Sequence, residues 1–242
     1  QEGPPIWNGR ILWRGVTESE AFLSGRTMIM AGHEALKFVC YPISNAPFRN
    51  GKYLINWIAE RYLPPDYRWR REDYNRTAKL EEFLPWFEGW TFDWLDVPRL
   101  IRDCPHAYEY PLVDRDPLER WTFGRVTLLG DAAHPMYPIG SNGATQAIMD
   151  ARAVADAFLQ HGADWRAALA RYEDQRRNAT TALTLANRRE GLDRILDLVD
   201  ERAPDGFTDL EAVLPARELE AIVSEYKTLA GHHVTIGAPK AS

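Results

Sequence analysis

The chain has 242 residues, enough for one large domain or two small ones, and its 45% hydrophobic and 26% charged residues are ordinary for a globular protein. Its formal net charge of −6 predicts no general attraction to nucleic acid or to anionic membranes. No apolar run approaches the roughly 18 residues that a membrane span needs. Cys40 and Cys104 are too few and too far apart to predict a disulfide framework or a zinc site, so a reducing cytoplasm is the expected location.

The first hundred residues read mainly as strands and turns. Four segments have strand length and are rich in β-branched and aromatic residues: 10–16, 26–32, 36–43 and 52–60. Residues 71–90 then show helical spacing in their apolar positions, and 107–113 form a further expected strand. We therefore expect residues 1–113 to form a mixed or antiparallel sheet domain with an inserted helix.

The second half reads as a short strand followed by helices. "RVTLL" (125–129) is an expected short buried strand ending at Gly130, and a helix is predicted from Ala144 to Gln160 with Gly162 as its stop. Residues 164–199 predict one broken helix or two packed helices, and another helical region follows from 208. The fold class is thus α+β or α/β, with further divisions expected at 114–163 and 164–242.

The junction "GDAAHPMYPIGSNGATQAIMDA" (130–151) carries the least ordinary pattern in the chain. A carboxylate at a strand end, here Asp131, suits hydrogen bonds from vicinal hydroxyls of a nucleotide-like cofactor. Gly140, Gly143 and Ala144 leave room for backbone N–H groups to approach a planar ring. The following helix N-terminus favours an anion or an electron-rich carbonyl, such as a flavin edge. A simpler interpretation makes Asp131 an N-cap or turn residue and the glycines parts of a bend.

This junction resembles the second flavin-binding motif of the FAD-dependent aromatic hydroxylases, the p-hydroxybenzoate hydroxylase-like monooxygenases. Four other segments resemble the phenazine hydroxylase branch of that family: "WRGVTESEAFLSGRTMIMAG", "KFVCYPIS", "YPLVDRDPLERW" and "YEDQRR". The resemblance implies an incomplete p-hydroxybenzoate hydroxylase-like flavoprotein fold. It comprises a substrate-domain sheet, the remaining part of the FAD-binding domain and C-terminal helices.

The resemblance also implies roles for individual residues. It assigns FAD binding to Gly130, Asp131, Pro138, Gly140, Asn142, Gly143, Ala144 and Thr145. Asp131 would bind the ribitol or the neighbouring pyrophosphate region, and the amides of Ala144 and Thr145 would contact the flavin N1–C2=O edge. Pro138 would lie beside flavin and substrate, with no protein group assigned as a certain catalytic residue. Lys37 and Tyr41, on one face of an expected strand, are candidate substrate contacts.

By the same resemblance, NAD(P)H would reduce the flavin and O2 would add at its C4a position. The resulting hydroperoxide would deliver oxygen to an aromatic or heteroaromatic, phenazine-like substrate. Two alternatives remain. One is a non-catalytic substrate-binding or subunit-contact module of the same fold that does not hold FAD on its own, and the other is a related flavoprotein that reduces or epoxidises. A monomer or a homodimer is expected.

One part of the family pattern is missing from these residues. No G-x-G-x-x-G turn, which holds the ADP half of FAD, occurs in the 242 residues. We therefore expect the chain to be the C-terminal portion of a longer enzyme, inactive without its N-terminal FAD-binding segment.

Other chemistries have little support in the sequence. None of the six histidines has a metal-ligand spacing, and no G-x-S-x-G elbow indicates a serine hydrolase. His134 follows Asp131 closely, but a loop-structuring role is expected for it rather than that of a base. "DQRRN" (174–178) is interpreted as the polar side of a helix.

Overall fold

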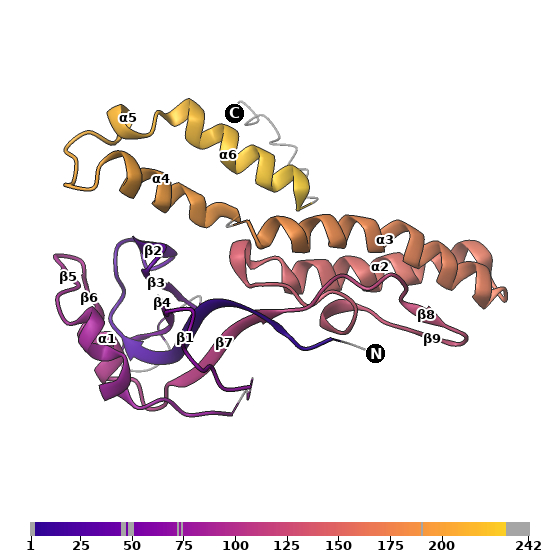
Figure 1. Ribbon diagram of the computed structural model, residues 1–242, viewed down its shortest axis with the longest axis horizontal. Coiled ribbons are helices and arrows are strands. Elements are labelled where there is room, and N and C mark those ends of the chain that lie inside the picture. Colours follow the sequence, from indigo (N-terminus) through magenta and orange to yellow (C-terminus); the bar gives the residue numbers. More distant parts are fainter. Residues whose placement is uncertain are drawn as a thin grey trace. The chain divides into compact units, whose positions relative to one another are not determined.

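The computed structural model describes residues 3–44, 47, 51–71, 73, 75–189 and 191–230. The chain divides into two compact units, one of residues 7–113 and one that combines residues 1–6 with 114–242 (Figure 1). The three-part division expected from the sequence stays a prediction. Within the described residues, none of the helices combines the length and the apolar character that a membrane crossing requires.

The unit of residues 7–113 is built on a five-stranded sheet with the order β2-β3-β4-β1-β7. Its strands are β1 (Ile6–Ser19), β2 (Ile29–His33), β3 (Leu36–Pro42), β4 (Tyr53–Tyr62) and β7 (Tyr108–Asp114). The pairs β1–β4, β2–β3 and β3–β4 are antiparallel. The expected strands are confirmed, although β1 lies between β4 and β7 instead of following chain order.

One face of this sheet carries the core of the unit. Alternate residues of three neighbouring strands, among them Trp13, Phe38 and Trp57, are almost fully buried on that face. Phe83 stacks on Trp13 with ring centroids 5.0 Å apart. The short helix α1 (Val97–Arg102) contributes Val97 and two further apolar side chains to the same cluster. Aromatic side chains therefore fill this core, which accounts for many of the nine tryptophans.

The prediction of a helix within residues 71–90 is wrong. Two short 3-10 turns, η1 (Leu80–Glu82) and η2 (Leu84–Phe87), occupy the place of the expected spacing. Pro85 lacks an amide donor and disfavours the preceding helical turn, and Phe83 has a non-helical φ of −136°. The spacing predicted which apolar residues are buried, but not the backbone geometry. Beyond it lies a small hairpin of β5 (Thr91–Phe92) and β6 (Leu95–Asp96).

The other unit is mainly helical. Its helices are α2 (Gly143–His161), α3 (Trp165–Asn187), α4 (Arg194–Arg202), α5 (Leu210–Val213) and α6 (Ala216–Leu229), with a 3-10 turn η5 (Gly191–Asp193) between α3 and α4. The long helices α2 and α3 pack side by side (Figure 1). Alanines of α2 and α3 let them approach closely around Trp121 and Tyr172. The expected stop at Gly162 is confirmed, because this residue caps α2 with a φ of +56°.

The prediction of a short buried strand at residues 125–129 is also wrong. Only Val126–Thr127 are strand, β9, and they pair with β8 (Thr122–Phe123) in a small hairpin. Val126 is 62% exposed and Leu129 is 43% exposed. An apolar run becomes a buried strand only where neighbouring strands accept its backbone hydrogen bonds, and the described residues place β8 alone beside it.

Candidate functional site

The loop between β9 and α2 brings two predicted flavin residues together. Gly130 and Asp131 lie in the 3-10 turn η3 (Gly130–Ala132), where Gly130 is buried with a φ of +58° and Asp131 is exposed. Gly143, twelve residues later, begins α2. A Cβ placed on Gly143 would lie 3.9 Å from Asp131 Oδ1, so the carboxylate sits beside the start of that helix. The Asp131 carboxylate and the side-chain-free Gly143 therefore lie next to each other. A hydroxyl chain of a cofactor could bind there.

The amino-terminal end of α2 presents backbone donors. The first helical amides of any α-helix have no intrahelical acceptor, so they need a cap, water or a ligand. Asn142 is the N-cap residue, yet among the described residues its side chain makes no capping hydrogen bond. Ala144 is exposed and Thr145 half-buried, which leaves this helix end accessible. An electron-rich carbonyl or an anion suits such a position.

The remaining predicted flavin residues lie between η3 and the start of α2. Pro138 is exposed and precedes the 3-10 turn η4 (Ile139–Ser141). Gly140, within η4, has a φ of +71°, a conformation that L side chains rarely adopt. The loop thus turns through glycine and leaves the Pro138 ring on its surface. The position of Pro138 beside flavin and substrate stays a prediction.

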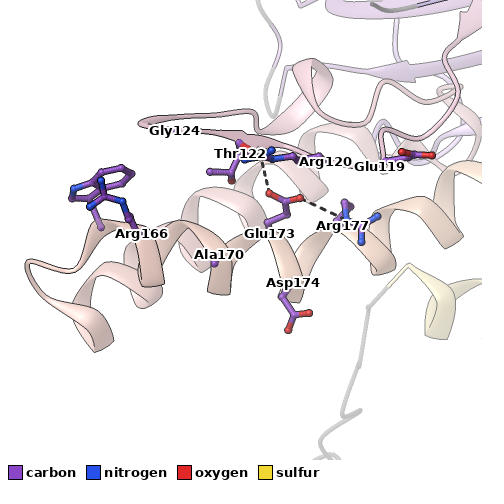
Figure 2. A pocket seen from close by; sticks show the side chains of 10 residues that line it. Glu119, Arg120, Thr122, Gly124, Arg166, Ala170, Glu173, Asp174 and Arg177 are labelled. Carbon is purple, nitrogen blue, oxygen red and sulfur yellow. Dashed lines mark hydrogen bonds and ion pairs between the residues drawn. The ribbon is translucent and has the colours of Figure 1, made fainter.

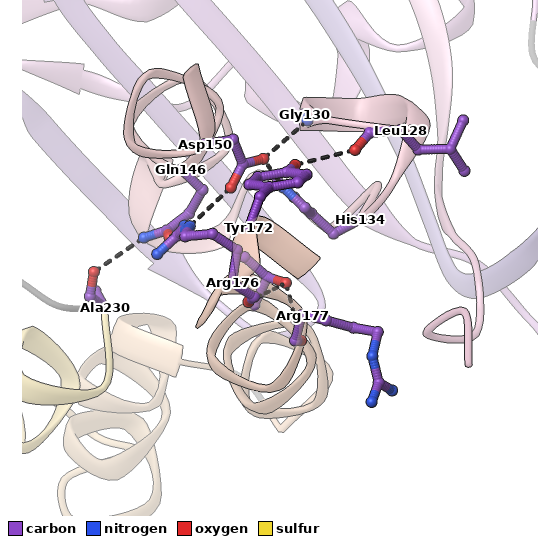
Figure 3. A network of polar contacts seen from close by, with 10 residues as sticks. Leu128, Gly130, His134, Gln146, Asp150, Tyr172, Arg176, Arg177 and Ala230 are labelled. Carbon is purple, nitrogen blue, oxygen red and sulfur yellow. Dashed lines mark hydrogen bonds and ion pairs between the residues drawn. The ribbon is translucent and has the colours of Figure 1, made fainter. Parts of the chain in front are cut away.

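A buried polar network lies behind the loop (Figure 3). Asp150 of α2 is fully buried, and its Oδ2 accepts the Gly130 amide at 2.9 Å and lies 2.6 Å from His134 Nε2. Arg176 of α3 donates to Asp150 Oδ1 at 2.8 Å and to Gln146 Oε1 at 2.6 Å. One carboxylate therefore holds both ends of the turn that carries Asp131.

The network bears on two expectations from the sequence, one for His134 and one for residues 174–178. His134 is 4% exposed and faces Asp150, which agrees with the loop-structuring role expected for it. Arg176 is 5% exposed, so the interpretation of residues 174–178 as the polar side of a helix is wrong for this residue. The sequence reasoning missed Asp150 altogether. The only available signal was a lone acidic residue on an alanine-rich face of a predicted helix.

Tyr226 of α6 is a second residue that the sequence did not indicate. Its hydroxyl accepts a hydrogen bond from Asn142 Nδ2 at 2.7 Å and lies 2.9 Å from Asn187 Oδ1. The same hydroxyl lies 3.0 Å from the carbonyl oxygen of Ile139 in the loop. No short-range pattern connects positions 142 and 226, because the contact joins segments that are 84 residues apart.

The two candidate substrate residues lie on the face of the sheet opposite its aromatic core. Lys37 is buried, and its Nζ lies 3.1 Å from Glu60 Oε1, an oxygen that Arg10 also approaches at 3.2 Å. Tyr41 is half-buried on the same face, opposite Asn56 of β4. The shared face agrees with the expected pleat, while the roles of both residues toward a substrate stay predictions.

A cavity of about 640 Å³ lies elsewhere (Figure 2). It opens between the β8–β9 hairpin and α3, where Glu173 accepts the Thr122 amide at 2.9 Å. Its lining residues are Glu119, Arg120, Thr122, Gly124, Trp165, Arg166, Ala170, Glu173, Asp174 and Arg177. None of the predicted flavin or substrate residues lines it, and acids balance its arginines, so it does not define the functional site.

Both cysteines are buried free thiols. Across the described residues, no group of three or more histidine, cysteine, aspartate or glutamate side chains is arranged to hold a metal ion.

Comparisons with known proteins match part of this chain to an FAD-binding family. Residues 112–186 match the FAD binding domain family. Phenazine 1,6-dicarboxylic acid hydroxylase of Lysobacter antibioticus is 46% identical over 181 residues, which are 73% of this chain and 44% of that protein. 3-Hydroxybenzoate 6-hydroxylase 2 of Aquipseudomonas alcaligenes is 45% identical over 123 residues, 50% of this chain and 38% of that protein. The chain therefore spans less than half the length of these relatives.

Solved structures show the same fold. A salicylate hydroxylase in complex with substrate superposes with a TM-score of 0.63 at 24% identity, over 98% of this chain and 59% of that one. HpxO of Klebsiella pneumoniae, complexed with FAD and uric acid, superposes with a TM-score of 0.59 at 21% identity, over 94% of this chain and 50% of that one. The expected p-hydroxybenzoate hydroxylase-like flavoprotein fold, in partial form, is confirmed.

Proposed function

Because the chain belongs to the FAD-dependent aromatic hydroxylase family, we propose that it forms part of an enzyme that hydroxylates an aromatic or heteroaromatic carboxylic acid. The observation that carries this proposal is the pairing of the Asp131 carboxylate with the uncapped start of α2. Relatives are named for rings of this class, including hydroxybenzoate, hydroxynicotinate and phenazine dicarboxylic acid. A flat, phenazine-like ring is the substrate that we favour.

The residues present fit a flavin. Asp131 would accept hydrogen bonds from its hydroxyl chain, and the amides of Ala144 and Thr145 would donate to its carbonyl edge. Gly143 leaves open the space beside Asp131, because a Cβ there meets no atom closer than 3.9 Å. When bound, FAD supplies the redox chemistry, taking electrons from NAD(P)H and using O2 to hydroxylate the ring. The protein positions the ring, excludes water and stabilises negative charge at the flavin edge.

We further propose that a segment outside these 242 residues holds the ADP half of FAD. Two facts support this: the relatives are more than twice as long as the stretch they share with this chain, and no G-x-G-x-x-G turn occurs here. The free thiols of Cys40 and Cys104 suit a reducing cytoplasm. A monomer or a homodimer is the proposed assembly.

A chimera tests the proposal. The chain is fused to the part of the Lysobacter relative that lies outside the 181 aligned residues. The chimera is expected to bind FAD stoichiometrically, to oxidise NADH or NADPH, and to add one oxygen atom to an aromatic carboxylic acid, detected by mass spectrometry. The Asp131→Ala chimera is expected to retain far less FAD, whereas Asp174→Ala, on the exposed side of α3, serves as the matched control. A folded chimera that binds no FAD and oxidises no ring would support the non-catalytic alternative instead.

A further inference from the structure

Tyr226 connects the last helix to the loop that leads into α2. It is 7% exposed, and its hydroxyl is surrounded by Asn142 Nδ2, Asn187 Oδ1 and the Ile139 carbonyl oxygen at 2.7 to 3.0 Å. At Gly140 a Cβ would overlap the Tyr226 hydroxyl, so the loop backbone runs directly against this side chain. The loop that leads into α2 therefore packs against the Tyr226 side chain.

Asn142 occupies the position where an asparagine usually caps a helix. An N-cap asparagine normally has an extended backbone, and its side-chain oxygen accepts the amide two or three residues on, here Ala144 or Thr145. Asn142 instead has φ −90° and ψ −19°, and within the described chain its side chain accepts neither amide. Its amide nitrogen is engaged by Tyr226. Asn142, the residue best placed to cap α2, is thus held away from the capping position.

We propose that Tyr226 is a positioning residue that diverts Asn142 from capping α2, so that the amides of Ala144 and Thr145 stay available to the flavin carbonyl edge. The part of this inference that concerns flavin rests on the proposed function; the part that concerns the helix end does not. Tyr226 touches neither substrate nor cofactor in this scheme, and it acts on the helix end through Asn142.

Two further contacts support the arrangement. Gln146, in the first turn of α2, donates to the carbonyl oxygen of Ala230 at 2.9 Å, so the end of α6 is tied to the same helix start. Burial raises the pKa of Tyr226 above its ordinary value, so the phenol stays protonated at neutral pH and can donate as well as accept. α6 therefore contacts both the loop and the helix end that it adjoins.

Amide hydrogen exchange of the 242-residue chain, followed by NMR, tests the inference without any flavin. In Tyr226→Phe, Asn142 loses its hydrogen bond to position 226 and is expected to cap α2, which slows exchange at Ala144 and Thr145 about fivefold. In the double variant Asn142→Ala/Tyr226→Phe, fast exchange should return. Asn142→Ala alone should not accelerate exchange, because Asn142 does not cap in the parent chain. Tyr172→Phe, which removes another buried hydroxyl, is the matched control and should leave both amides unchanged.

The outcomes separate the two proposals. Unchanged exchange in Tyr226→Phe, or faster exchange in Asn142→Ala, would overturn the role of Tyr226. In the chimera described above, Tyr226→Phe should weaken FAD binding by the same factor of about five, measured by flavin fluorescence. Slowed exchange combined with unchanged FAD affinity would leave the positioning role intact and would contradict the flavin site itself.

Discussion

At the scale of single residues, Gly140 shows how tightly the loop depends on its neighbours. It combines a φ of +71° with a Cβ position that the Tyr226 hydroxyl already fills. We expect Gly140→Ala to lower the free energy of unfolding by about 1–3 kcal/mol or more, because strain and overlap add. Gly162→Ala is the matched control, since Gly162 has a similar φ of +56° but no atom within 4 Å of its Cβ position. Equal losses in urea unfolding for both variants would show that the Tyr226 contact is absent in solution.

Cys40 gives a second prediction at this scale. It is completely buried in the sheet core, and burial raises its pKa to about 12. Since the thiolate is the reactive form, the folded protein should not react with a thiol reagent at Cys40 at neutral or mildly alkaline pH. Mass spectrometry after iodoacetamide treatment is expected to show Cys40 labelling only once urea unfolds the chain. Rapid labelling of the native protein would contradict this burial.

At the scale of elements, Asp150 ties α2, α3 and the Asp131 turn together. Asp150→Asn keeps the shape but leaves the buried Arg176 guanidinium without its carboxylate. Removing one partner of a buried ion pair typically costs about 3–5 kcal/mol of unfolding free energy. We expect a loss of this size in urea unfolding, whereas Asp156→Asn, whose partner Arg152 is exposed, should change stability by less than about 1 kcal/mol. A small effect at Asp150 would mean that the network is not formed.

The same carboxylate predicts a pH dependence. Burial alone raises the pKa of Asp150, but hydrogen bonds from His134, Arg176 and the Gly130 amide outweigh it and hold this pKa below the ordinary aspartate value. Its stabilisation is therefore complete above the unfolded-state pKa of about 3.9 and is lost as pH falls through the folded-state pKa. Melting temperatures below about pH 4 should fall more steeply in the parent chain than in Asp150→Asn. Parallel curves would contradict the lowered pKa.

Prediction from sequence succeeded for elements whose residues carry a local signal. It failed where a contact with a residue far away in the sequence determines the structure. The strands around Trp13 and Trp57 are rich in β-branched and aromatic residues, and α2 ends at a glycine, so these elements could be predicted directly. The apolar spacing around Phe83 correctly predicted burial, yet Pro85 prevented an α-helix. The motif assigned Asp131 and Gly143 to one cofactor loop, and the structure places the Cβ position of Gly143 3.9 Å from Asp131 Oδ1. Tertiary partners such as Asn142 with Tyr226 carry no local pattern, because their sequence separation has no fixed period.

At the scale of the whole molecule, one face of α2 is apolar although it is exposed. Ile148 is 72% exposed and Leu159 is 83% exposed, and both lie on one stripe with the exposed alanines 151 and 155. A contiguous apolar stripe in water usually marks a surface that another segment covers. Because the relatives extend well beyond the shared stretch, we propose that the covering segment is the remaining part of the FAD-binding domain, for which small alanines permit close approach.

A charge on this stripe distinguishes a covered surface from an exposed one. In the 242-residue chain, Ile148→Lys should change the free energy of unfolding by less than about 0.5 kcal/mol, as exposed substitutions usually do. In the chimera with the Lysobacter segment, the same lysine would be buried without a partner and should cost more than about 2 kcal/mol. Leu210→Lys, at a position 48% exposed on α5, is the matched control and should behave alike in both chains. Equal effects of Ile148→Lys in the two chains would mean that the stripe stays open to water, and the covering segment would have to bind elsewhere.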